Sequence, residues 1–157
     1  MIRNLSRRLF KGLKRTDGAN LIEGAIVTPI LLLLTFGIIE FAMVFFTFLA
    51  LQNGVSQATR YGITGNVSGS MSRVDSIKSA MRQATPTLTI PDSAFTFQHM
   101  SPGGSSWAAG TGAPGEVEKV TVAYTWQFFT PLMRPFFPTG RLTLRVDSIM
   151  KNESRFN

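Results

Sequence analysis

Two glutamates stand in the longest apolar stretch of the chain, and they are the first residues whose chemistry needs an explanation. Glu23 opens a run from Gly24 to Leu51 in which Glu40 is the single charged residue. The separation of the two acids in the sequence corresponds to about 25 Å along a helix. A carboxylate in a low-dielectric environment is costly unless it is paired. Glu40 is therefore either a functional intramembrane group or a solvated side chain near the edge of a membrane, and the sequence leaves both interpretations open.

Few other residues have the types or the spacing that catalysis requires. The chain has one histidine, His99, and no cysteine, which excludes a histidine-based triad, a multi-histidine metal site and a zinc–thiolate site for a single chain. Glu116 and Glu118 share one face of a predicted strand, where a solvated strand edge is the favoured interpretation. We therefore expect no enzymatic activity and no cofactor.

The apolar run from Gly24 to Leu51 predicts a membrane-spanning helix. Such a helix would be about 40 Å long, which exceeds the ~30 Å hydrocarbon core of a bilayer. The run is longer than the apolar region of a secretory signal peptide and continues past Glu40. Pro29 lies inside the run, where its missing N–H group is expected to kink the helix.

Basic residues gather before this run and predict its orientation. The segment 1–18 holds six basic residues and one acidic residue, whereas the remainder of the chain holds ten and eight. The six are Arg3, Arg7, Arg8, Lys11, Lys14 and Arg15. This bias places the N-terminus in the cytoplasm and the residues after about Leu51 outside it. The net charge of +7 is thus mostly a property of the N-terminal leader, and it does not indicate a nucleic-acid-binding face on the distal part.

The N-terminal segment carries a series of features in a fixed order: a basic leader, Gly18, ANLIE at 19–23, Pro29, a leucine run, FGIIEF at 36–41 and LQNGVSQATRYG at 51–62. In these features it resembles the TadE-like pilins, or pseudopilins, of bacterial tight-adherence (Flp) pilus systems. The resemblance covers about residues 17–62. Gly24 departs from the pattern, because such proteins usually carry an aromatic residue after the glutamate.

The resemblance implies proteolytic processing followed by assembly. A prepilin peptidase would cut between Gly18 and Ala19 and leave a mature chain that begins at Ala19. Glu23 would then pair with the N-terminal amine of a neighbouring subunit and set the register between helices. The alternative for Glu23 is an ordinary acid at a helix N-terminus, where the helix dipole favours it.

Contacts between neighbouring helices in the membrane would involve the small and polar residues of the span. These are Gly24, Pro29, Gly37, Glu40 and Ala42. The implied partners are a prepilin peptidase, other pilin or pseudopilin subunits, an inner-membrane pilus assembly platform and membrane lipid. The implied role is in pilus assembly, adherence or biofilm formation at the bacterial inner membrane or in a surface pilus. The alternative function is an uncleaved single-pass membrane protein whose extracytoplasmic domain binds a partner.

Two helices and a sheet are expected from the membrane span onward. The long helix should run from about Leu21 to Tyr61, because apolar residues continue on one stripe past Leu51. We therefore divide the chain into a leader at 1–18, a long helix at 19–61 and an extracytoplasmic α+β domain at 62–157.

A second helix is predicted from about Arg73 to Ala84. Ser72 and Asp75 have the spacing of a capping box, and Pro86 ends the helix. Its apolar face is formed by Val74, Ile77, Met81 and Ala84. Its basic residues, Arg73, Lys78 and Arg82, are expected to face water.

Three distal segments alternate apolar and polar residues with the period of a β-strand. They are 95–98, 120–128 and 142–147. Because each has one apolar face, they predict an antiparallel sheet that packs on one side against helix, as in a pilin-like fold.

Two loops separate these strands. Residues 101–115 hold five glycines and two prolines and predict no regular element; they are either disordered or carry a contact through Trp107. Residues 129–140 hold five large apolar side chains and three prolines. If exposed, this second cluster would be an assembly or membrane-interface patch. If folded back it would be core, which is the favoured interpretation.

Overall fold

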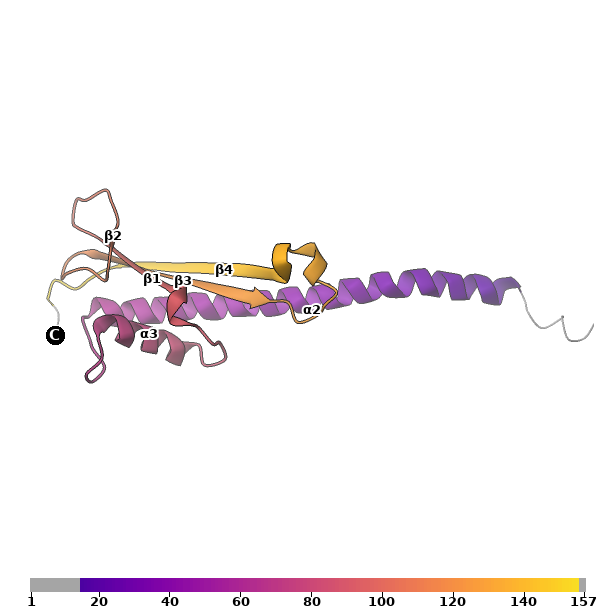
Figure 1. The fold of residues 1–157 in the computed structure, drawn as a ribbon, viewed down its shortest axis with the longest axis horizontal. Coiled ribbons are helices and arrows are strands. Elements are labelled where there is room, and N and C mark those ends of the chain that lie inside the picture. Colours follow the sequence, from indigo (N-terminus) through magenta and orange to yellow (C-terminus); the bar gives the residue numbers. More distant parts are fainter. Residues whose placement is uncertain (1–14, 156–157) are drawn as a thin grey trace, which may run out of the picture.

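The computed structural model describes residues 15–155, and one long helix organises it. This helix, α2, spans Arg15–Ile63 and continues through Pro29. It extends beyond the expected Leu21–Tyr61 at both ends. Figure 1 shows that the first half of α2 projects alone, whereas the second half lies along the remainder of the protein. Among the described residues α2 is the one helix that is long and apolar enough to cross a membrane.

The two halves of α2 differ in burial. Every residue from Gly18 to Phe36 is exposed. Beyond Gly37 a buried stripe follows at three- and four-residue spacing, which places its members on one face of the helix. The stripe consists of Glu40, Val44, Thr47, Leu51, Val55, Ala58 and Thr59. On the uncovered face, Phe45 and Phe46 are 64% and 67% exposed. The folded domain therefore covers one face of the C-terminal half of α2 and leaves the N-terminal half bare.

The buried face of α2 packs against a four-stranded antiparallel sheet with strand order β2-β1-β3-β4. Its strands are β1 (Phe95–Met100), β2 (Ala108–Ala109), β3 (Val117–Gln127) and β4 (Arg141–Lys151). The α+β fold, the second helix and the three longer strands confirm the sequence-based prediction. The core of the sheet forms where Val122 lies opposite both Phe95 and Val146.

β2 corrects the prediction that residues 101–115 form no regular element. Ala108 and Ala109 pair with His99 and Gln98 of β1. Strand pairing uses backbone N–H and C=O groups, so these two alanines join the sheet edge without an alternating side-chain pattern.

The second helix, α3 (Arg73–Ala84), has the predicted bounds and the predicted Ser72 cap, whose side chain accepts from the Asp75 N–H. Ile77 and Met81 of α3 are fully buried. Close packing against α2 depends on two glycines: a Cβ added at Gly54 would lie 2.8 Å from the Met81 sulfur, and one at Gly62 would lie 2.7 Å from Ile77 Cδ1. The missing side chains thus allow α3 to approach the backbone of α2.

Three short 3-10 helices complete the domain: η1 (Asp92–Ala94), η2 (Arg134–Phe136) and η3 (Pro138–Gly140). The last two lie in the apolar loop 129–140. Some side chains of this loop are part of the core, and others are exposed. Met133 is buried, and the Phe137 ring stacks on Phe128 with centroids 4.2 Å apart. Phe129 and Phe136 are exposed, as is Leu132. The prediction of core is therefore correct for only part of this loop.

Candidate functional site

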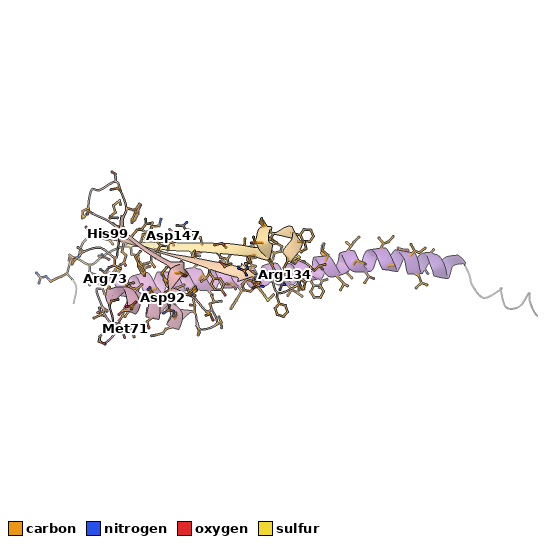
Figure 2. The ribbon with its side chains drawn as sticks, viewed as in Figure 1. Met71, Arg73, Asp92, His99, Arg134 and Asp147 are labelled. Atoms are coloured by element: carbon orange, nitrogen blue, oxygen red, sulfur yellow. The ribbon has the colours of Figure 1, made fainter. Side chains whose placement is uncertain are left out.

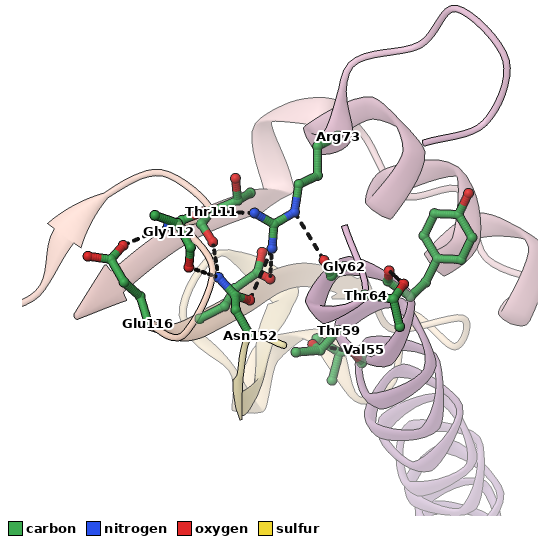
Figure 3. Close-up of polar contacts among 12 residues, drawn as sticks. Val55, Thr59, Gly62, Thr64, Arg73, Thr111, Gly112, Glu116 and Asn152 are labelled. Atoms are coloured by element: carbon green, nitrogen blue, oxygen red, sulfur yellow. Dashed lines mark hydrogen bonds and ion pairs between the residues drawn. The ribbon is translucent and has the colours of Figure 1, made fainter. Parts of the chain in front are cut away.

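A buried ion pair stands at the end of the domain farthest from the bare helix. The Glu118 side chain is fully buried, and its Oε2 lies 3.0 Å from Nη2 of Arg73. Arg73 also donates to the carbonyls of Gly62 at 3.0 Å and Gly112 at 2.7 Å, and to Asn152 Oδ1 at 3.0 Å (Figure 3). One guanidinium therefore joins the end of α2, the loop after β2, strand β3 and the segment after β4.

This cluster corrects two expectations. The sequence predicts that Arg73 faces water and that Glu118 occupies a solvated strand edge, yet both side chains are withdrawn from solvent. Each residue is in phase with buried neighbours: Glu118 alternates with Val120 and Val122, and Arg73 lies one turn before Ile77. The burial pattern of each element thus extends one position farther than its apolar residues do.

Burial dominates the electrostatics of the pair. It raises the pKa of Glu118 to about 7, although the positive charge of Arg73 and its hydrogen bond act in the opposite direction. The same burial lowers the pKa of Arg73, opposed by the attraction of Glu118. Removing two charges from water costs more than their mutual attraction returns. The pair therefore acts to hold four segments in register, and it is not a large net source of stability.

The raised pKa makes domain stability depend on pH. Because the folded-state pKa of Glu118 is about 7 against an ordinary 4.5, the folded state binds the proton more tightly. The stabilisation is complete below about pH 4.5 and is lost as the pH rises towards 7. We expect the free energy of unfolding to fall across this window by an amount on the order of 3 kcal/mol. Denaturant unfolding at a series of pH values measures it.

The control for this prediction is Glu118→Gln, which retains the shape of the side chain and removes its titration. At each pH, the difference between the free energies of unfolding of the wild type and the variant isolates the contribution of Glu118, since the other titrating groups are common to both proteins. The pKa of Asp92 is lowered mainly by its hydrogen bond with Arg82, and that of Glu116 by the Ala113 N–H. The stability that these two acids contribute is lost only as the pH falls below their ordinary pKa values of 3.8 and 4.5, which lies outside the window in which Glu118 titrates. An identical pH dependence in both proteins would contradict the assignment.

Glu40 is the second buried acid, at the opposite end of the domain. Its side chain is fully buried, and one oxygen accepts from the backbone N–H of Thr130. The next residue, Phe41, contacts Phe137 with ring centroids 6.3 Å apart. The interpretation of Glu40 as a solvated side chain is therefore wrong. Glu40 continues the buried stripe of α2 by one turn and fastens the loop 129–140 to the helix.

The predicted processing and register residues lie apart from both polar clusters. Gly18, Ala19, Glu23, Gly24 and Pro29 are all exposed on the bare half of α2. A Cβ added at Gly18 or Gly24 would meet no atom within 4 Å among the described residues. In Figure 2 this half of the helix extends beyond Arg134, which marks the near end of the domain, whereas Arg73 marks the far end. The bare surface is thus open to a neighbour or to lipid.

Gly37 and Ala42 differ in what surrounds them. A Cβ at Gly37 would lie 3.9 Å from the sulfur of Met133, so the chain's own loop occupies this position. Ala42 is exposed and lines an apolar groove of about 520 Å³. The groove lies between three elements. Met43 lines it from α2, Leu88 from the turn before η1, and Trp126 from β3. Of these two small residues, Ala42 is the one that remains accessible.

A comparison with known proteins bears on these surfaces. The model of the family described as TadE-like protein matches residues 18–60. The match begins at the predicted processing glycine and ends near the C-terminus of α2, so it covers the bare half of the helix and the half that carries the domain. Neither a curated protein nor a solved structure matches the chain. Together with the single apolar helix among the described residues, the family match indicates membrane anchoring.

Proposed function

We propose that the chain, whose residues 18–60 match the TadE-like family model, acts as a minor pilin or pseudopilin of a Tad-type pilus system. In this role it is processed by a prepilin peptidase, anchored in the inner membrane with its domain outside the cytoplasm, and assembled with other pilin-like subunits. The family is pilin-like and is not a family of enzymes. The proposed function is therefore assembly and not turnover.

The observation that carries this proposal is the length of exposed apolar surface on α2. Large apolar side chains are exposed from Leu21, at 76%, to Leu49, at 59%, over about 42 Å of helix. A bilayer covers ~30 Å of this length, and the usual tilt of about 20° shortens it only to about 39 Å. If the bilayer covers the bare half of the helix from Leu21 onward, Phe45, Phe46 and Leu49 lie beyond the lipid. Contact with the helices of neighbouring subunits would remove them from water.

The accessible groove supports the same function. It adjoins the uncovered face of α2 and is lined by Phe46, Met43 and Ala42 together with Leu88 and Trp126. Apolar grooves beside a helix are suited to the apolar face of a second helix. In this proposal the bare half of α2 brings subunits together within the membrane. Outside the membrane, the groove and the surface of the domain determine which neighbouring subunit fits.

The N-terminus of the membrane-extracted protein tests the proposal. We expect a terminus at Ala19, and a chain that lacks residues 1–18, in cells with their prepilin peptidase, and the intact chain in cells without it. Intact mass and terminal peptide sequencing distinguish the two. Gly18→Leu is expected to block cleavage, because a bulky residue replaces the smallest one on the carbonyl side of the cut bond.

Ala25→Leu is the matched control, since it adds a leucine side chain at another exposed position of the same helix. It should be cleaved normally. A terminus at Met1 in every strain would leave an uncleaved single-pass membrane protein with a partner-binding domain, which is the alternative function.

A further inference from the structure

Three exposed apolar side chains project from the loop 129–140 at the end of the domain nearest the bare helix. Phe129 is 79% exposed, Phe136 is 65% exposed and Leu132 is 42% exposed. Arg134 is the one charged residue of this loop, and the loop holds no acid. Such a cluster is unfavourable in water and indicates a surface that is covered in the working protein.

The loop is fixed at a defined level of α2 by three contacts. Met133 packs on Gly37, the Thr130 N–H donates to Glu40, and Phe137 packs against Phe41. The domain thus begins at residues 37–41 of the helix. Figure 2 shows Arg134 at this end of the domain, beside the point where α2 emerges alone.

The bare helix has the length of a membrane. Every residue from Gly18 to Phe36 is exposed. This segment corresponds to about 28 Å of helix, against the ~30 Å hydrocarbon core. If the bilayer surrounds this segment, its surface lies at the level of Gly37, which is where the loop is attached. The exposed phenylalanines are therefore continuous with the surface that lipid already covers.

We propose that the loop 129–140 is a second membrane contact, through which the domain rests on the bilayer that α2 spans. Phe129, Leu132 and Phe136 enter the interface between headgroups and acyl chains, and Arg134 lies among the phosphates. Apolar side chains accompanied by a basic one are the composition of interfacial anchors. A second attachment restrains the tilt and rotation of the domain about α2. The contact is independent of cleavage and of the proposed role in a pilus.

The test uses the absence of cysteine from the chain. Single variants Phe136→Cys and Phe129→Cys of the full-length protein are spin-labelled and placed in nanodiscs of phosphatidylcholine and phosphatidylglycerol. Oxygen, which partitions into lipid, and a water-soluble nickel chelate then compete as relaxation agents. Val67→Cys, an apolar and 53% exposed position after α2 at the far end of the domain, is the control. The intrinsic fluorescence of Trp107 and Trp126 checks that each variant is folded.

We expect the ratio of oxygen to nickel accessibility to be severalfold higher at both loop positions than at the control. Equal ratios at all three positions would overturn the proposal, because the loop would then lie in water. Protection from both agents, with spin–spin broadening that disappears on dilution with unlabelled protein, would also overturn it. That outcome would assign the loop to a contact with a second copy of the chain.

Discussion

Replacing Arg73 with alanine is expected to lower the free energy of unfolding of the domain by about 3 to 5 kcal/mol, the cost of leaving one partner of a buried ion pair alone. The substitution leaves the fully buried Glu118 carboxyl group without its partner and removes donors from two backbone carbonyls and from Asn152. Both tryptophans lie in the domain. Their fluorescence during urea unfolding of the detergent-solubilised protein therefore measures the change.

Arg82→Ala is the matched control, because it makes the same substitution on the same helix. Arg82 pairs with Asp92, and the two side chains are 43% and 67% exposed. Exposed ion pairs contribute roughly 0 to 1 kcal/mol. If Arg73→Ala lowered the free energy of unfolding no more than Arg82→Ala does, the polar cluster around Arg73 would not hold the domain together.

Replacing Glu23 with alanine is expected to abolish pili while leaving processing intact. Glu23 is exposed in the bare half of α2, and the structure shows no ion pair to it from residues 15–155. A carboxylate in the membrane costs about 3 kcal/mol unless a neighbour provides a positive charge. Losing a register contact of that size weakens each subunit contact on the order of 100-fold. Electron microscopy and immunoblots of sheared pili measure the loss.

Two further variants distinguish the effect of losing the Glu23 charge from the effect of changing the exposed surface of the helix. Glu23→Gln keeps the size and removes the charge, so it should fail almost as severely as alanine if pairing with an amine is required. Thr28→Ala removes another exposed polar group from the same half of α2, and it should support normal pili. Normal piliation by a strain whose sole copy carries Glu23→Ala would refute the register hypothesis.

Several elements are predictable because their signals are local. The run of apolar residues specifies a long helix, Ser72 and Asp75 specify the start of α3, and alternation specifies the long strands. β2 is not predictable, because its two alanines pair with β1 through backbone groups alone. The glycines that admit α3 carry no usable signal either, since Gly54 and Gly62 resemble ordinary loop or helix glycines until the packing partner is known.

The buried charges show most clearly what sequence reasoning misses. The sequence assigns Arg73 and Glu118 to solvent and leaves Glu40 open, because an isolated charged side chain is usually exposed. All three lie in phase with the buried positions of their own elements. Extending each apolar period by one position would place them inside. Only their partners explain why burial is tolerated, and these partners come from distant parts of the chain.

The long apolar helix, the resemblance of residues 18–60 to the TadE-like family and the α+β character of the domain are readable from the sequence, because hydrophobic length, motif order and residue period are properties of contiguous segments. Where the bare helix ends, which charges are buried and which face of α2 remains open become visible only in the folded chain. These features depend on contacts between residues far apart in the sequence, such as that of Thr130 with Glu40, which are 90 positions apart. No periodicity within a single segment encodes such a contact.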